Sequence, residues 1–256
     1  MELIDTHAHL DFSEYYGERE QVIKRARDRG VIKIVNIGTD LSSSRRSLAL
    51  SQQYQCVYAA VGVHPHNADE VELQQARLLL KDLAKADKVK AIGEIGLDFH
   101  YDNSPRNIQK EVFEELVELA VELQLPVIIH SREAAAETME ILEEYSFANR
   151  AGIMHCFAGD DNMAERALQL GFYIAVGGII TFKNSQKLCQ TISRIPLERL
   201  LVETDCPFLT PEPNRGKRNE PAYVQHVVHR LADIKNVSPE EVAAQTVQNA
   251  RDVFLF

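Results

Sequence analysis

Short runs of apolar residues alternate with amphipathic stretches from one end of the chain to the other. The runs are rich in Val, Ile and Leu and are apolar at successive positions, which is typical of parallel strands covered by helices. They predict eight strands, at residues 3–6, 31–37, 57–63, 89–92, 127–129, 152–154, 172–176 and 199–202. The stretches between them carry apolar residues every three or four positions and predict helices, most clearly over residues 106–124 and 134–145.

Two serines followed by proline mark expected helix starts. Ser104 precedes Pro105, so we expect Ser104 to cap the helix and Pro105 to occupy its first position. Ser238 and Pro239 repeat this arrangement, and Glu241 adds an acidic residue three positions after the cap.

The strict alternation of strands and helices, with no linker rich in Gly, Ser or Pro, predicts one domain over residues 1–256. A doubly wound open sheet is the competing α/β architecture. Such sheets usually have fewer strands and often carry a glycine-rich phosphate loop after the first strand, and neither feature is evident here. Because eight strand–helix units suit a barrel of about 250 residues, we expect a single (β/α)8 TIM barrel.

The composition is that of a soluble globular enzyme, with 45% hydrophobic and 26% charged residues. No run approaches the roughly 18–20 apolar residues of a membrane span, and the N-terminus lacks the features of a signal peptide. The four cysteines form no CxxC pair, so we expect reduced thiols in a cytoplasmic protein. The sequence indicates no oligomeric partner.

The net charge of −10 argues against a protein that coats duplex nucleic acid. Such proteins are usually basic, because Lys and Arg neutralise the phosphates. An anionic substrate would therefore be held locally, in a pocket and by metal ions.

Most residues able to carry chemistry follow predicted strands. They are His7 and His9 after the first strand, His64 and His66 after the third, Glu94 after the fourth, His130 after the fifth, His155 after the sixth, and Glu203 and Asp205 after the eighth. In a parallel barrel the C-terminal ends of all strands open on one face, so we expect these side chains to converge there. His7 and His9, like Glu203 and Asp205, are two residues apart and on a strand would point the same way.

Several imidazoles and carboxylates aimed at one cavity predict two divalent cations. A single histidine at a strand end is normally a hydrogen-bonded core residue, but charges packed together without cations cost several kcal/mol each. Glu94 is the natural bridge, because each of its oxygens can bind one cation. Imidazoles favour Zn or Mn over Mg, which prefers oxygen ligands, so Mg, Mn and Zn all stay open.

Seven segments give the chain a resemblance to a known family. They are Asp5 to Leu10 (DTHAHL), Gly62 to His66 (GVHPH), Ile92 to Asp98 (IGEIGLD), Pro126 to Arg132 (PVIIHSR), His155 to Phe157 (HCF), Leu201 to Pro207 (LVETDCP) and Arg215 to Pro221 (RGKRNEP). Together they resemble the TatD family of metal-dependent deoxyribonucleases over essentially the whole chain. The HxH pair is shared with the wider amidohydrolase group, whereas the last two segments are far more specific.

The resemblance implies a (β/α)8 barrel that hydrolyses phosphodiester bonds with two divalent ions, usually described as magnesium. Carried over residue by residue, one ion is held by His7, His9, Glu94 and Asp205, and the other by Glu94, His130 and His155. Asp205 also takes a proton from the attacking water, and Glu203 supports it or handles protons. The implied substrate is DNA, most naturally the 3′ end of a single strand.

Candidate substrate-binding residues lie near the same face. Arg215, Lys217 and Arg218 form a basic run in the loop after the eighth strand, and such loops commonly bind phosphate in barrels. Further phosphate-side candidates at the rim are His64, His66, Ser131 and Arg132. Phe157, His100 and Tyr101 offer stacking surfaces for a base, or pack in the ordinary way.

Two other functions stay open from the sequence. The same metals suit an ester or amide hydrolase, such as one that removes a D-amino acid from transfer RNA. A non-catalytic barrel that binds a ligand is the third possibility, although the intact set of ligands and acids argues against it.

Overall fold

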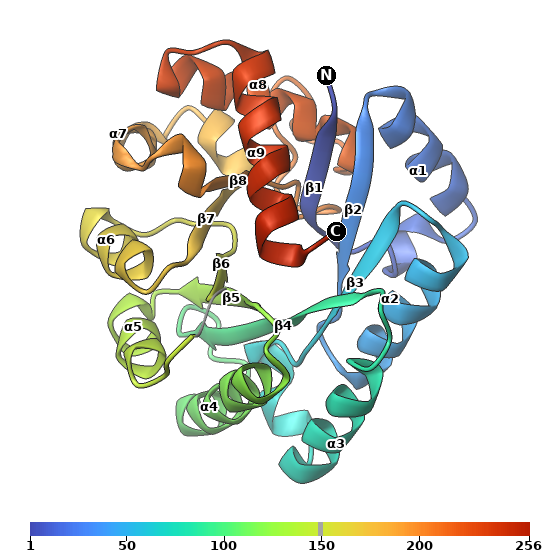
Figure 1. The fold of residues 1–256 in the computed structure, drawn as a ribbon, viewed down its shortest axis with the longest axis vertical. Coiled ribbons are helices and arrows are strands. Elements are labelled where there is room, and N and C mark those ends of the chain that lie inside the picture. Colours follow the sequence, from blue (N-terminus) through green and yellow to red (C-terminus); the bar gives the residue numbers. More distant parts are fainter. Residues whose placement is uncertain (148–150) are drawn as a thin grey trace.

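The computed structural model describes residues 1–147 and 151–256, and its strands form one parallel sheet in the order β1 to β8 (Figure 1). The strands are β1 (Leu3–Ala8), β2 (Val31–Ile37), β3 (Val57–Val61), β4 (Val89–Asp98), β5 (Val127–Arg132), β6 (Gly152–Met154), β7 (Tyr173–Val176) and β8 (Leu200–Val202). A parallel bridge between Ala8 and Cys206 brings the first strand to the end of the last. The expected (β/α)8 barrel is confirmed.

Helices surround the barrel on the outside (Figure 1). They are α1 (Arg19–Asp28), α2 (Leu41–Gln53), α3 (Leu73–Leu83), α4 (Arg106–Leu123), α5 (Ala135–Glu143), α6 (Asp161–Gln169), α7 (Gln186–Arg194), α8 (Val224–Lys235) and α9 (Pro239–Phe254). Helix α9 lies across one end of the barrel, where Val247 and Phe254 pack with the strand residues Ile4 and Ile37. This leaves the C-terminal ends of the strands as the open face.

One of the two expected helix caps is confirmed. The Ser238 hydroxyl accepts a hydrogen bond of 3.1 Å from the Glu241 amide at the start of α9. The prediction that Ser104 caps α4 is wrong, because this helix begins at Arg106 and no side chain caps it. Ser104 instead donates a 2.8 Å hydrogen bond to Asp69, in the short 3-10 helix η2 (Pro65–Glu70), and so holds this segment against the start of α4.

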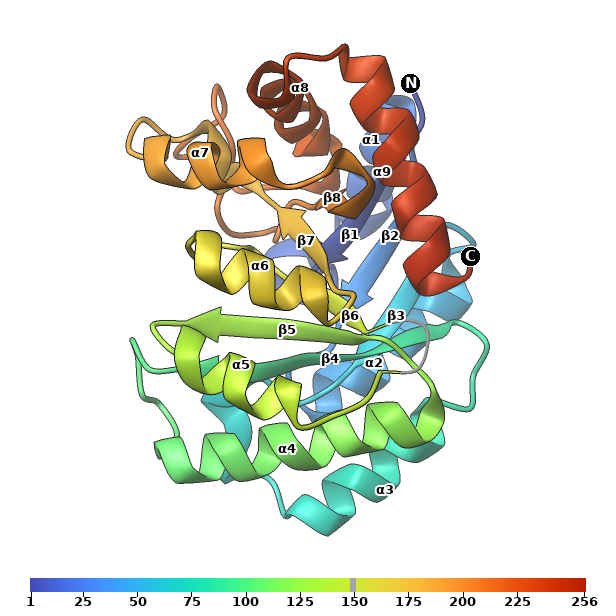
Figure 2. The same ribbon diagram turned by 60° about the vertical axis from the view of Figure 1, so that its left-hand side comes forward.

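Strands β4 and β5 are longer than the sequence predicts, as Figure 2 shows. The expectation that Glu94 ends its strand is wrong, because β4 continues to Asp98. Glu94 lies in a bulge, where the β4–β5 register shifts between Gly93 and Ile95. At Gly96, with φ of 138°, a Cβ atom would meet the His130 carbonyl oxygen at 2.0 Å, so only glycine allows this approach. The two strands thereby form one wall of the open face.

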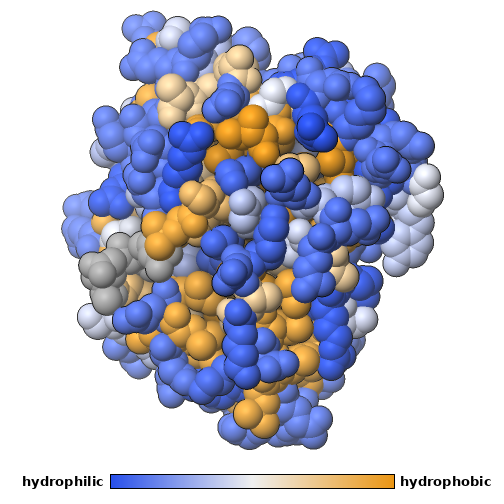
Figure 3. Space-filling model, turned by 45° about the vertical axis from the view of Figure 1, so that its right-hand side comes forward, coloured by the Kyte–Doolittle hydropathy of each residue, from blue (hydrophilic) through white to orange (hydrophobic). Residues whose placement is uncertain are grey.

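On the face shown in Figure 3, hydrophilic side chains predominate and hydrophobic ones form small groups between them. Within residues 1–147 and 151–256, no helix has the length and apolar character that crossing a membrane requires.

Candidate metal centre

A cavity of about 690 Å³ opens at the C-terminal ends of the strands. Its lining includes the predicted residues His9, His64, His66, Glu94, His130, Ser131, Arg132, His155 and Asp205. These residues come from β4, β5 and the segments that follow β1, β3, β6 and β8. The fold therefore gathers side chains that are up to 196 residues apart in the sequence (9 to 205).

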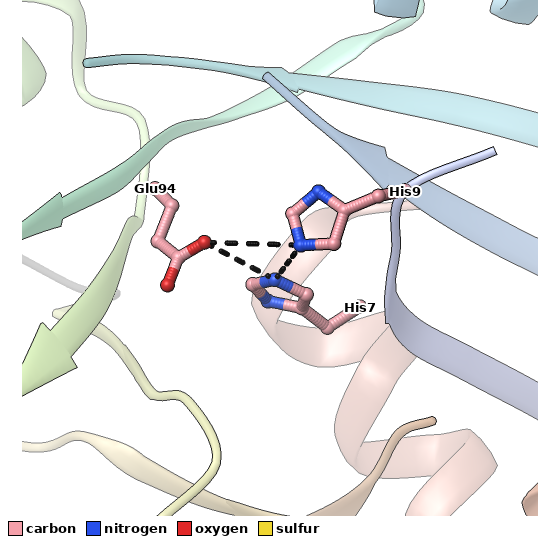
Figure 4. Close-up of side chains that lie close together, drawn as sticks. All are labelled: His7, His9 and Glu94. Atoms are coloured by element: carbon pink, nitrogen blue, oxygen red, sulfur yellow. Dashed lines mark hydrogen bonds and ion pairs between the residues drawn. The ribbon is translucent and has the colours of Figure 1, made fainter. Parts of the chain in front are cut away.

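A first group of ligand-type atoms lies where β1 meets β8. The Nε2 atoms of His7 and His9 are 3.2 Å apart, and Glu94 Oε2 lies 3.4 Å from the first and 4.0 Å from the second (Figure 4). Asp205 Oδ1 lies 3.8 Å from His7 Nε2 and 3.4 Å from His9 Nε2. Ligand atoms about 2.0–2.2 Å from one cation lie about 3–4 Å from each other, so this group fits a divalent cation.

Backbone bonds that close the barrel also assemble this group. The Asp205 amide donates to the His7 carbonyl at 2.9 Å, and the His9 amide donates to the Cys206 carbonyl at 2.8 Å. Beneath them the buried Asp5 carboxylate accepts from the Thr204 hydroxyl at 2.6 Å and from the Thr204 amide at 2.9 Å. The same contacts that join the first and last strands therefore bring Asp205 beside the HxH pair.

A second group faces the other oxygen of Glu94. Its Oε1 lies 2.9 Å from His130 Nδ1, 3.6 Å from His155 Nε2 and 3.7 Å from His64 Nε2. The carboxylate is buried, with a side-chain exposure of 4%. Glu94 therefore stands between two imidazole groups with one oxygen toward each.

Asp98, which was not among the predicted site residues, supports the second group. Its Oδ2 accepts from His130 Nε2 at 3.2 Å and from His66 Nε2 at 2.9 Å. Burial opposes its ionisation, but the hydrogen bond from His130 and the Tyr101 amide lower the pKa of Asp98 below its ordinary value. One sequence feature could have pointed to Asp98: it lies four residues after Glu94, and β4, which contains both, is longer than the apolar run predicts.

Glu203 supports His155 from the side away from Glu94. The expectation that Glu203 and Asp205 share a strand face is wrong, because β8 ends at Val202 and Asp205 has a left-handed φ of 56°. Glu203 Oε1 accepts from the Cys156 amide at 2.7 Å and lies 2.9 Å from His155 Nδ1. An imidazole backed in this way by a carboxylate is held in one orientation and becomes a better ligand.

Only some of the predicted substrate-binding residues line the cavity. Its lining includes Ser131, Arg132, His64 and His66 but none of the three basic residues of the loop. Arg218 pairs with Glu18 at 2.8 Å, and Arg215 stacks over Phe182 at 4.1 Å. Lys217 is exposed. The two arginines contact other parts of the chain, and the role of the three basic residues in substrate binding stays a prediction.

Aromatic side chains form part of the rim. Tyr101 lines the cavity, and Arg132 lies 4.6 Å from the centre of its ring. Of the other stacking candidates, His100 pairs with Glu133 and Phe157 is buried in the core. Phe208 also lines the cavity and is 49% exposed, and no sequence pattern pointed to it.

Burial and charge work against each other throughout the cluster. Burial acts to lower the pKa of His155, but the charges of Glu203 and Glu94 raise it to about 10. Burial likewise opposes ionisation of Glu94, and the surrounding imidazoles, His155 foremost among them, hold its pKa well below 4.5. Protons on imidazoles therefore balance the carboxylates of the metal-free cluster, and divalent cations are suited to take their place.

Comparison with known proteins identifies the family. The family described as TatD related DNase matches residues 4–255. This chain belongs to the TatD family. It is 45% identical over 253 residues to the uncharacterized metal-dependent hydrolase YabD of Bacillus subtilis, with 98% of both chains covered. It is 36% identical over 258 residues to the 3'-5' ssDNA/RNA exonuclease TatD of Erwinia tasmaniensis, covering 98% of this chain and 99% of that relative.

The TatD likeness extends to solved structures. The TatD homologue YjjV of Escherichia coli has a TM-score of 0.94 with 34% sequence identity, covering 99% of this chain and 98% of that one. A hydrolase of the TatD family from Entamoeba histolytica has a TM-score of 0.86 at 25% identity, covering 99% of this chain and 98% of that one. The chain is thus a metal-dependent hydrolase of the TatD family.

The raised pKa of His155 predicts that metal binding at pH 7 releases protons. With a pKa of about 10 against 6.5, the metal-free imidazole is protonated, and its contribution to folding is full below pH 6.5 and lost as the pH rises through 10. Coordination needs the unprotonated nitrogen, so metal affinity should rise about tenfold per pH unit for each proton displaced. Calorimetric titration with Mn²⁺ in buffers of different ionisation enthalpy measures this release.

Glu203→Gln is the matched control, because it removes a charge that raises the pKa of His155. This variant should release fewer protons on binding the same metal. Equal metal affinity at pH 7 and pH 9 in the unmodified protein would contradict the prediction.

Proposed function

We propose that this protein hydrolyses phosphodiester bonds at the ends of single-stranded nucleic acid, using two divalent cations (Mg, Mn or Zn). One observation carries the proposal: the two oxygens of Glu94 face two separate groups of histidines. A carboxylate shared in this way is the arrangement of two-metal hydrolases that act at phosphorus. The name of the Erwinia relative, a 3'-5' ssDNA/RNA exonuclease, supports the same substrate class.

Each residue of the cluster has a proposed part. His7, His9, Glu94 and Asp205 would hold one cation, and Glu94, His130 and His155 would hold the other. When bound, such cations neutralise charge on a phosphoryl group and make a water molecule more acidic. Asp98 and Glu203 orient His130 and His155.

Asp205 is the proposed base. Its Oδ1 lies 3.4 Å from His9 Nε2 and 3.9 Å from His155 Nε2, so it reaches toward both groups. Burial opposes its ionisation, but the hydrogen bond to His9 and the charges of His155 and His7 lower the pKa of Asp205 below 3.8. The carboxylate is therefore ionised at neutral pH and is able to accept a proton from the attacking water.

The cavity favours a short, unpaired stretch of substrate. Among the described residues that line the cavity, Arg132 is the one with a permanent positive charge, so few phosphates beyond the scissile one are neutralised by side chains. Tyr101 and Phe208 on the rim offer faces on which unpaired bases can stack. A strand end satisfies both conditions better than a continuous duplex does.

Hydrolysis of end-labelled single-stranded DNA tests the proposal. Exhaustive chelation should abolish turnover, and adding Mn²⁺ or Mg²⁺ should restore it, with products shortened from the 3′ end. Closed circular single strands and D-aminoacyl transfer RNA serve as parallel substrates. Faster release of the amino acid than of nucleotides would replace the proposed substrate, and full activity without metal would overturn the mechanism.

Replacing the base should leave the fold and stop the chemistry. Asp205→Asn keeps the side-chain shape but removes the charge, and general base catalysis contributes about 10²–10⁴-fold. We therefore expect turnover of single-stranded DNA to fall at least about a hundredfold. Glu143→Gln removes a surface charge that pairs with Arg166 and should leave turnover unchanged. Undiminished turnover in Asp205→Asn would assign the base to another group.

A further inference from the structure

His64 lies on the cavity wall between β3 and η2, and a backbone bond fixes the protonation of its ring. The amide of His66 donates a 3.1 Å hydrogen bond to His64 Nδ1. A backbone amide can only donate, so Nδ1 must carry a lone pair and no proton. The ring proton of His64 is therefore on Nε2, the atom that faces the cluster.

The neighbouring histidines have the opposite arrangement. His9 Nδ1 lies 3.2 Å from the carbonyl oxygen of Ile37, which can only accept, so a proton stays on Nδ1 and Nε2 is the nitrogen that can be freed for a cation. His130 Nε2 likewise donates to the Asp98 carboxylate, so the proton that its Nδ1 directs to Glu94 at 2.9 Å is the one that a cation would replace. His9 and His130 can thus offer a lone pair to a cation, whereas His64, whose Nδ1 already accepts, presents an N–H.

Distance alone does not separate these roles. His64, Glu94 and His130 offer atoms within 4.8 Å of one another, as the ligands of one ion would. The Nε2–H of His64, however, cannot bind a cation, and at 3.7 Å from Glu94 Oε1 it is beyond hydrogen-bond distance. With a side-chain exposure of 12%, this donor points into a nearly enclosed part of the cavity.

We propose that His64 is not a metal ligand but a fixed hydrogen-bond donor that holds a phosphoryl oxygen of the substrate beside the second group. This inference rests on the proposed function, because a phosphoryl oxygen bound near Glu94 Oε1 is what such a donor would meet. The His66 amide that orients the ring belongs to the chain itself, so the N–H donor of His64 is in place before the substrate binds. His64 thereby adds a substrate contact to a wall otherwise made of cation ligands.

Two substitutions of His64 test its Nε2–H donor separately from the hydrogen bond that its Nδ1 accepts from the His66 amide. In His64→Asn the side-chain oxygen can still accept from the His66 amide, since Asn is a favoured cap residue, but nothing occupies the position of Nε2. In His64→Gln the amide nitrogen reaches the position of Nε2. His130→Asn, which removes a proposed ligand, is the comparison.

The measurements are cations bound per chain, by elemental analysis, and the affinity of the Mn²⁺-loaded protein for inorganic phosphate, by calorimetry. His64→Asn should keep both cations and bind phosphate about 10- to 100-fold more weakly, the loss of a hydrogen bond to a charged group. His64→Gln should keep both cations and recover much of the affinity. His130→Asn should lose one cation.

Loss of a cation in either His64 variant would overturn the proposal, as would unchanged phosphate affinity in His64→Asn. Neither measurement uses nucleic-acid turnover. A failure of the proposed nuclease activity is therefore seen separately, in the assay with labelled DNA, and leaves the result for His64 standing.

Discussion

The burial of one carboxylate between two sets of imidazoles is the constraint on which the site depends. Glu94 is almost fully removed from water, and an ion in that position costs several kcal/mol unless opposite charges surround it. Imidazoles of raised pKa supply those charges when protonated, with one oxygen facing His9 and the other facing His130 and His155. In the proposed mechanism cations would replace these protons and share the same carboxylate, so one set of contacts would serve both stability and chemistry.

The barrel is built to hold that carboxylate in place. A bulge in β4 sets Glu94 apart from the regular ladder, and β4 and β5 extend beyond it to form the wall that carries Asp98 and His130. On the opposite side, the bonds that join β1 to the segment after β8 fix Asp205 beside the HxH pair. The buried carboxylates of Asp98 and Glu203 lie against the outer nitrogens of His130 and His155. The contacts that close the barrel therefore also assemble the side of the site that carries Asp205.

The sequence predicts the barrel well because each strand is a short apolar run, and it predicts which residues face the mouth because they follow those runs. It underestimates β4 and β5, since Glu94, Gly96 and His130 interrupt the apolar runs of these strands with residues that carry no apolar signal. The contacts of the basic loop cannot be predicted for another reason: the partner of Arg218 is Glu18, 200 residues away, and such a pairing cannot be inferred from local composition. The positions of the ring protons, which distinguish His64 from His9, depend on hydrogen bonds with backbone groups that only the folded chain brings together.

Electron paramagnetic resonance of the Mn²⁺-loaded protein tests most directly whether Glu94 joins two cation sites. Cations that share one carboxylate lie about 3.5–4 Å apart. If Glu94 joins two cation sites, we expect two Mn²⁺ per chain with the spectrum of a magnetically coupled pair, and loss of that coupling in Glu94→Ala. A spectrum of isolated Mn²⁺ from the unmodified protein at full loading would contradict it.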